Sequence, residues 1–257
     1  MVLKISDIDL SWKEEYISSF LPIILALFFF SCYWFIANSE KIKQYFYDKY
    51  DFDTASYRHI FFTKIVGFIS MGVVPVIFCL LFIDAIPFEK YGVTFIPQTA
   101  LFSLAWILGL SAVLIPIAYY SAKNPKNLLN YPQIRSKIWT NKIVLINASG
   151  WLLYLFGYEF LFRGVLLVPL VQSLGVWPAI AVNIALYSAT HIPKGLDETI
   201  GAIPLGLVLC MLTLLSGTIW IAFIVHVVMA WTNCFTALYY HPEIHYAGSS
   251  FIKKQNA

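Results

Sequence analysis

Long apolar runs constrain this chain more than any other feature of its sequence. Seven can be traced in the 257 residues, near 16–37, 61–83, 99–120, 143–171, 176–192, 199–216 and 217–240. A helix needs roughly 20 apolar residues to cross a hydrocarbon core about 30 Å thick, and most of the runs approach or exceed that length. Because 60% of the residues are hydrophobic and only 12% are charged, we expect an integral membrane protein surrounded by a lipid bilayer.

The expected fold class is all-α. The runs show no alternation of apolar and polar residues, so they are predicted to be helices rather than strands of a barrel. The prediction is a polytopic transmembrane bundle of about seven spans, with a range of six to eight because the last four runs are separated by short turns. Residues 1–140 are expected to form a casing of three spans plus an interfacial loop. Residues 141–257 are expected to form a core that carries the polar motifs and ends in a short cytoplasmic tail.

Basic residues indicate how the bundle is oriented. The loop between spans two and three offers only Lys90, and the tail carries Lys253 and Lys254. The loops after spans one and three hold the larger group of basic residues, Lys41, Lys43, Lys49, Arg58, Lys123, Lys126, Arg135, Lys137 and Lys142. The positive-inside rule therefore predicts an N-terminus outside and a C-terminus in the cytoplasm. Lys64 lies near the end of its run, where its side chain can snorkel to the headgroups.

Charge and cysteine content exclude several function classes. The net charge of +3 is small and spread over loops, so no nucleic-acid partner is expected. The four cysteines sit singly within apolar runs at irregular spacing, which argues against a disulfide framework or a cysteine zinc site.

Two opposite charges interrupt the fourth run. In the stretch "YEFLFRG", Glu159 and Arg163 are the only fully charged residues between Lys142 and His191. At positions i and i+4 of a helix they lie on one face and can pair. A pair that faces the bundle interior avoids a cost of roughly 2.5–3.5 kcal/mol for each unpaired charge at mid-membrane. Such a pair is either a structural staple between helices or part of a functional site.

Two later runs carry polar rows at helical spacing. Asn183, Tyr187 and His191 follow one another at intervals of four in "NIALYSATH", and His226 and Asn233 are seven apart in "HVVMAWTN". A lone membrane histidine is commonly a hydrogen-bonding residue between helices. Here three helices carry such groups: a glutamate–arginine pair, a histidine, and a histidine–asparagine pair. Together they provide a carboxylate and an imidazole that could activate a water, and an imidazole and an amide that could stabilise an oxyanion.

The ordered stretches "YEFLFRG", "YSATHIPKGLDE" and "HVVMAWTN" resemble the motif set of the CAAX protease and bacteriocin-processing family of intramembrane proteases, also called the CPBP or Abi family. The resemblance covers roughly residues 143–240. By position, Glu159 matches the second glutamate of the first motif and Arg163 its arginine. His191 matches the histidine of the second motif, and His226 matches the final histidine.

The chain departs from the family pattern at two positions. Tyr158 occupies the position of the first glutamate, and Ala230 occupies the position four after His226, with the amide instead at Asn233. An aromatic residue before the glutamate and the interval of seven also resemble a divergent bacterial branch of the family. The membrane is accordingly expected to be the bacterial cytoplasmic membrane.

The resemblance implies a membrane-embedded endopeptidase that cleaves a membrane-associated peptide or protein tail. Glu159 would act as the base or orient it, and Arg163 would hold Glu159. His191 would position the water, while His226 and Asn233 would polarise the carbonyl. Further candidate residues are Tyr158, Asn183 and Glu198, the last being either a second candidate base or a solvated carboxylate at a helix start.

Three alternatives stay open. No cofactor is required, but His191, His226 and a carboxylate could supply the ligands of a catalytic zinc ion. Tyr158 and Ala230 favour a non-catalytic relative that acts as a bacteriocin self-immunity factor or a membrane scaffold. The two histidines could also serve as ligands in a haem or ion carrier.

Overall fold

The computed structural model describes residues 9–247, and helices form nearly all of their regular structure. The helices are α1 (Ile17–Ala37), α2 (Glu40–Lys49), α3 (Phe52–Gly67), α4 (Val74–Phe82), α5 (Pro97–Ala122), α6 (Pro125–Leu128), α7 (Asn141–Glu159), α8 (Leu167–Leu174), α9 (Val176–Ala189), α10 (Leu196–Ser216) and α11 (Trp220–Tyr240). Two π-helical segments (Phe68–Val73 and Phe160–Leu166) and three 3-10 turns (Glu14–Tyr16, Phe88–Tyr91 and Ile192–Lys194) complete the helical parts. The prediction of an all-α fold is confirmed.

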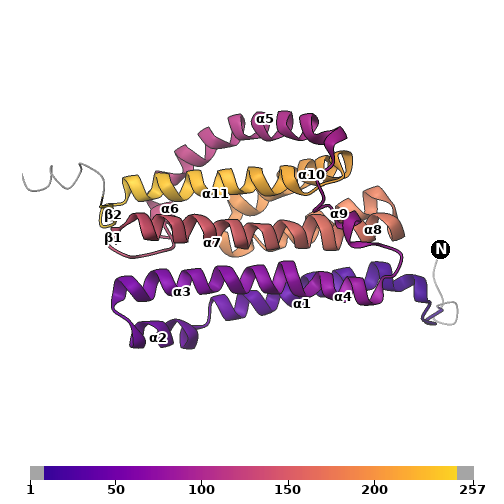
Figure 1. Cartoon of the computed structure of the whole chain (residues 1–257), viewed down its shortest axis with the longest axis horizontal. Coiled ribbons are helices and arrows are strands. Elements are labelled where there is room, and N and C mark those ends of the chain that lie inside the picture. The colour runs from indigo at the N-terminus through magenta and orange to yellow at the C-terminus, as the bar shows by residue number, and fades with distance from the viewer. Residues whose placement is uncertain (1–8, 248–257) are drawn as a thin grey trace, which may run out of the picture.

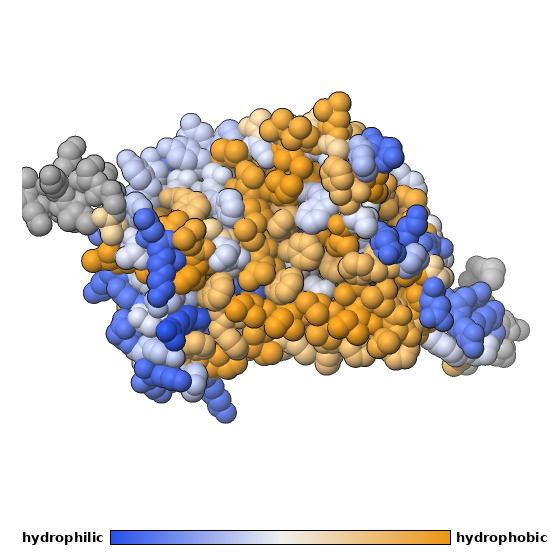
Figure 2. Space-filling view, in the orientation of Figure 1, coloured by the Kyte–Doolittle hydropathy of each residue, from blue (hydrophilic) through white to orange (hydrophobic). Residues whose placement is uncertain are grey.

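Six helical segments of the described residues are long and apolar enough to span a membrane. They are Glu14–Ala37, Phe52–Phe82, Pro97–Ala122, Asn141–Leu174, Leu196–Ser216 and Trp220–Tyr240. Figure 2 shows the corresponding apolar band between hydrophilic residues at the two ends of the molecule. The number lies within the predicted range, and the chain is an integral membrane protein. The predicted span at 176–192 instead contains α9, whose 14 residues measure about 21 Å and fall short of a hydrocarbon core.

The long helices run side by side, with α7 and α11 between α5 on one side and α1 and α3 on the other (Figure 1). Helix α5 packs on α11, α3 on α7, and α1 on α8. Helix α1 begins at one end of the bundle and α11 finishes at the opposite end. The predicted tail residues Lys253 and Lys254 lie outside the described residues.

Glycines allow close helix contact beside α7. A Cβ added to Gly157 would lie 2.9 Å from the Cα of Phe68, and one added to Gly72 would lie 2.9 Å from the Cα of Gly157. Both contacts are with backbone atoms, which cannot move aside as a flexible side chain can. The backbone of the π-helical segment Phe68–Val73 is therefore in direct contact with the backbone of α7.

The segment between α5 and α7 is fastened to the start of α3. The backbone nitrogen of Arg135 donates to Ser56 Oγ at 2.6 Å, and that of Lys137 donates to Asp53 Oδ1 at 2.9 Å. Strand β1 (Ile138–Trp139) then pairs in parallel with β2 (His245–Tyr246) after α11. These contacts tie the beginning of α7 to α3 and to the segment after α11.

Lys64 does not snorkel. Its side chain is buried in the middle of the segment Phe52–Phe82, and its ammonium lies 3.3 Å from the ring centroid of Trp151 and 4.5 Å from that of Tyr154. The expectation of a snorkelling side chain was wrong because α3 begins at Phe52, about 18 Å before Lys64 along the helix. The lysine side chain is therefore enclosed between α3 and α7.

Candidate active site

The predicted Glu159–Arg163 pair forms where α7 gives way to the π-helical segment Phe160–Leu166. Arg163 Nε donates to Glu159 Oε2 at 3.1 Å, and both side chains are completely buried. All seven residues of the π-helical segment are buried as well. Within it, Gly164 is required by packing, since a Cβ there would lie 2.6 Å from the carbonyl oxygen of Tyr91.

Helix α11 brings His226 to the other oxygen of the carboxylate. His226 Nδ1 lies 2.6 Å from Glu159 Oε1. Because a carboxylate accepts, Nδ1 carries the hydrogen, and the lone pair of a neutral imidazole is on Nε2. Nε2 makes no hydrogen bond within residues 9–247, and the side chain is 15% exposed. Both oxygens of Glu159 are thus occupied, whereas His226 retains an accessible basic nitrogen.

Asn183 and Cys210 hold the outer part of the guanidinium. Arg163 Nη1 donates to Asn183 Oδ1 at 2.7 Å and to Cys210 Sγ at 3.0 Å. Asn183 Nδ2 in turn donates to the carbonyl of Phe162 at 2.6 Å. The ring of Tyr187 lies against the same group, with 4.5 Å between Arg163 Cζ and the ring centroid. The sequence did not reveal Cys210, because a single cysteine in an apolar run forms no pattern.

His191 lies just beyond α9 in the turn that leads to α10. Its Nδ1 is 2.9 Å from the carbonyl oxygen of Tyr187, which can only accept, so Nδ1 again carries the hydrogen and Nε2 the lone pair. Pro193 follows in the 3-10 turn, and Gly195 turns the chain back with a φ of +109°, a backbone conformation that favours glycine. The turn therefore places His191 at the end of the polar row that begins at Asn183.

The ring of Tyr158 lies near both histidines. The centroid of its ring is 6.3 Å from that of His191 and 5.8 Å from that of His226. Its hydroxyl is 2.7 Å from Thr190 Oγ1, and Thr190 Oγ1 donates to the Tyr187 carbonyl at 2.7 Å. Tyr158 therefore donates to Thr190, a residue that the sequence analysis did not single out.

Two predicted residues lie apart from this cluster. Glu198 forms an exposed ion pair with Lys194 at 3.5 Å in the first turn of α10. Asn233 Oδ1 accepts a hydrogen bond from Asn127 Nδ2 at 2.7 Å, and Asn233 lies about 10.5 Å along the helix from His226. Asn233 is therefore fastened to α6 rather than to the carboxylate–histidine pair.

The zinc alternative does not fit this arrangement. Within residues 9–247, no three His, Cys, Asp or Glu side chains converge closely enough to hold a metal ion. Glu159 directs one oxygen to Arg163 and the other to His226 Nδ1, which carries a hydrogen. The carboxylate is thus engaged in hydrogen bonds rather than free as a ligand.

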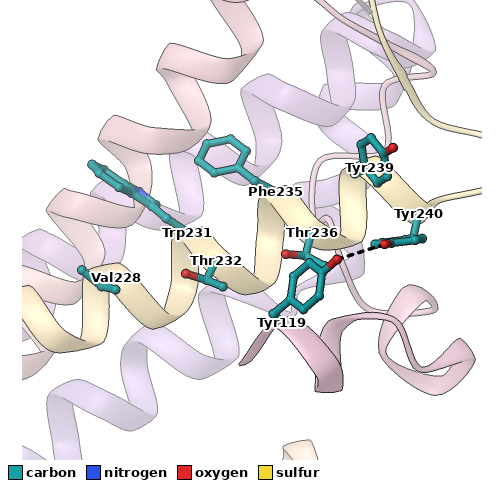
Figure 3. Close-up of a pocket in the computed structure, with 8 residues that line it drawn as sticks. All are labelled: Tyr119, Val228, Trp231, Thr232, Phe235, Thr236, Tyr239 and Tyr240. Carbon is teal, nitrogen blue, oxygen red and sulfur yellow. Dashed lines mark hydrogen bonds between the residues drawn. The ribbon is translucent and has the colours of Figure 1, made fainter. Parts of the chain in front are cut away.

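An open cavity of about 430 Å³ lies elsewhere, between α5 and α11 (Figure 3). Its lining residues are Tyr119, Val228, Trp231, Thr232, Phe235, Thr236, Tyr239 and Tyr240. The hydroxyls of Tyr119 and Tyr240 are 3.1 Å apart at its rim. None of the candidate site residues lines this cavity, so the polar cluster is a separate and more deeply buried feature.

Fold and site together define a polytopic helical membrane protein with a buried carboxylate–histidine–arginine cluster and a second histidine close by. Residues 139–232 match the family model described as Rce1-like, the type II CAAX prenyl endopeptidase Rce1-like family. The match bears out, for this segment, the resemblance to the CAAX protease and bacteriocin-processing family. It includes Glu159, Arg163, His191 and His226 and stops one residue before Asn233. No curated protein and no solved structure matches the chain.

Proposed function

We propose that this protein is a membrane-embedded endopeptidase that cleaves a membrane-associated peptide or protein tail by histidine-assisted attack of water. The observation that carries the proposal is the bond of 2.6 Å between Glu159 and His226 Nδ1, in a cluster that Arg163 neutralises. A buried carboxylate that holds Nδ1 of an imidazole fixes its tautomer and stabilises the imidazolium that forms when Nε2 takes a proton.

Each cluster residue then has a role. His226 is the base, and Glu159 orients it rather than acting as the base, because both oxygens of Glu159 are engaged. Arg163 holds Glu159, and Asn183 holds Arg163. His191 positions the attacking water through Nε2, since its Nδ1 is bound to a backbone carbonyl.

The reaction conserves atoms and charge. The water oxygen attacks the scissile carbonyl carbon while one water proton moves to His226 Nε2. The C–N bond of the tetrahedral intermediate then breaks, and the proton on Nε2 passes to the leaving nitrogen. The products are a carboxylic acid and an amine, and His226 returns to its neutral form. No cofactor takes part in these steps.

The setting of the proposed enzyme is the bacterial cytoplasmic membrane, with the N-terminus outside and the C-terminus in the cytoplasm. Residues 1–140 form the casing and residues 141–257 the core that carries the chemistry. The division into casing and core is supported by helix packing. Helix α3 packs on α7 and α5 packs on α11, so helices of the first part flank two helices that carry the polar cluster.

The test compares the full-length wild type with His191→Ala, His226→Ala and Glu159→Gln in cells, at matched membrane levels. Mass spectrometry of the membrane and soluble fractions would look for new peptide termini. Ser149→Ala is the matched control on α7, because Ser149 is exposed and its hydroxyl bonds only to carbonyls of its own helix. Size-exclusion chromatography of each variant checks that it remains folded, since Glu159→Gln leaves the Arg163 charge buried without a counter-charge.

Termini that disappear in both histidine variants and persist in Ser149→Ala would support the proposal. Loss in His191→Ala alone would move the role of base from the Glu159–His226 pair towards Glu198, and Glu198→Gln would then be the decisive variant. Termini unaffected by any of these changes would reject the peptidase. The cluster would in that case be the framework of a non-catalytic relative, such as a bacteriocin self-immunity factor or scaffold, as Tyr158 at a family glutamate position favours.

A further inference from the structure

Helix α11 lines an open groove beside α5 with two rows of side chains. One row contains Val228, Thr232, Thr236 and Tyr240, and the other contains Trp231, Phe235 and Tyr239. Residues four apart lie on one face of a helix, so the spacing sets a row that is mostly small beside a row that is aromatic. Tyr119 of α5 completes the lining of this groove of about 430 Å³ (Figure 3).

The groove is about as long as one leaflet of a membrane is thick. Val228 and Tyr240 are the first and last residues of α11 that line it, and the helix between them measures about 18 Å. One leaflet accounts for half of a hydrocarbon core about 30 Å thick. Because α11 spans the membrane and ends at Tyr240, the groove runs from the interior of the bilayer to its surface. An acyl chain of a lipid has the length and the apolar character to fill it.

Lys123 places a cation at the outer end of the groove. Its ammonium lies 3.8 Å from the ring centroid of Tyr119 and 4.9 Å from that of Tyr240. Within residues 9–247, Lys123 forms no ion pair with a carboxylate. It directly follows α5, so the cation lies where an apolar span ends, at the depth of the lipid headgroups.

Two hydroxyls accompany this cation. The hydroxyl oxygens of Tyr119 and Tyr240 are 3.1 Å apart, and the bond between them uses one of their two hydrogens. The other hydrogen can be donated to a further acceptor. Both tyrosine side chains are exposed, so a ligand can reach them. An ammonium and a hydroxyl donor side by side suit a phosphate group, which accepts charge-assisted hydrogen bonds and supplies the missing negative charge.

Further basic residues surround the outer end of the groove. Arg135 Nη1 lies 3.2 Å from Nε2 of His241, the residue that follows α11. Lys126 lies in α6, directly after the turn that contains Lys123, and is exposed. Anionic lipids collect at clusters of basic residues next to membrane spans. The charge at this end therefore favours a negatively charged headgroup over a zwitterionic one.

We propose that the groove between α5 and α11 binds a phospholipid with an anionic headgroup. One acyl chain lies along α11 beside Val228 and Phe235, and the phosphate bonds to Lys123 and to the hydroxyl pair of Tyr119 and Tyr240. The site goes beyond the proposed peptidase function, because none of the candidate catalytic residues lines the groove. The lipid contacts the helix that carries the candidate base without contacting the base itself.

The test measures lipid binding by native mass spectrometry of the full-length protein in detergent. The probes are dioleoylphosphatidylglycerol, which is anionic, and dioleoylphosphatidylcholine, which has the same acyl chains and no net charge. Inorganic phosphate is the competitor that carries the charge without a chain. The proteins are wild type, Lys123→Met, Tyr240→Phe, Thr232→Phe and the control Lys43→Met, whose lysine is exposed and paired with Glu40.

Wild type and Lys43→Met are expected to bind the anionic lipid about fivefold more tightly than the zwitterionic one, the usual effect of one basic residue at an anionic surface. Lys123→Met should remove this preference and still bind the zwitterionic lipid, because methionine keeps the apolar stem and loses the charge. Tyr240→Phe should reduce the preference in part, since the ring stays and a hydroxyl donor is lost. Thr232→Phe should weaken binding of both lipids, because the added ring occupies the groove.

Equal affinity of wild type for the two lipids would overturn the site, and so would a preference that survives Lys123→Met. Release of the anionic lipid by inorganic phosphate would show a phosphate-ion site and reject the phospholipid. Unchanged affinities in Thr232→Phe would reject the place of the acyl chain in the groove. Thermal unfolding of each variant checks that it is folded. The peptidase is tested separately by the histidine-dependent termini, so failure of the lipid site leaves that proposal intact.

Discussion

At the scale of single residues, the main difference between this site and the family pattern is Tyr158, which occupies the position of the first glutamate. Its hydroxyl donates to Thr190, and its ring packs against both histidines. A phenol bound to a threonine cannot replace a carboxylate as a base near neutral pH, because its ordinary pKa is about 10. The contribution of Tyr158 is therefore expected to come from its ring.

Substitution Tyr158→Phe tests this interpretation. Histidine-dependent cleavage should fall by less than about tenfold, because a neutral hydrogen bond contributes only about 0.5–1.5 kcal/mol. Tyr158→Ala should cause a much larger loss, since it removes the ring that packs against both His191 and His226. The measurement is the yield of the His191-dependent termini at matched membrane levels. Complete loss in Tyr158→Phe would instead assign a direct role to the hydroxyl.

Residue spacing predicted which polar residues share a helix face, but not the further residues that bond to them. The interval of four between Glu159 and Arg163 and between Asn183 and Tyr187 predicted which side chains share a helix face. Cys210 and Thr190 were missed because an isolated small polar residue in an apolar run produces no periodicity. Asn233 follows His226 by seven residues, but translation along the axis of α11 carries its amide to Asn127 on α6.

At the scale of elements, hydropathy predicted the long helices but not their irregularities. The run at 176–192 yields the short α9, since Pro193 follows the run and Gly195 turns the chain back towards α10. The π-helical segments at Phe68–Val73 and Phe160–Leu166 leave no hydropathy signal, because their residues other than Ser70 and Arg163 are apolar, as in the helices around them. One of them contains Arg163, consistent with the frequent occurrence of π-helical turns at functional sites.

The close contact at Gly157 gives a prediction for helix packing. Gly157→Ala should destabilise the protein by about 1–3 kcal/mol, the usual cost of overpacking, because the new methyl group would overlap the backbone at Phe68. Gly201→Ala on α10 is the matched control, since a Cβ there meets nothing within 4 Å. The control should be neutral or stabilising by up to about 1 kcal/mol, because alanine is the better helix former. Thermal unfolding in detergent measures both, and equal unfolding temperatures would show that the two helices can move apart.

At the scale of the whole molecule, the arrangement of basic residues indicates how the bundle is oriented in the membrane. Lys43 and Lys137 belong to the end of the bundle where α11 finishes, while Lys90 lies in the connection between α4 and α5 near the other end (Figure 1). If the first end faces the cytoplasm, the positive-inside rule is satisfied, because that end carries the larger group of basic residues.

Cysteine labelling of full-length protein tests this orientation. Lys43→Cys and Lys137→Cys should react with a membrane-impermeant maleimide only after cells are permeabilised, whereas Lys90→Cys should react in intact cells. All three side chains are exposed, so accessibility differs only by the side of the membrane. The background is low because Cys79, Cys210 and Cys234 are buried, and wild type controls for the partly exposed Cys32. Labelling of Lys43→Cys in intact cells, with Lys90→Cys protected, would invert the proposed topology.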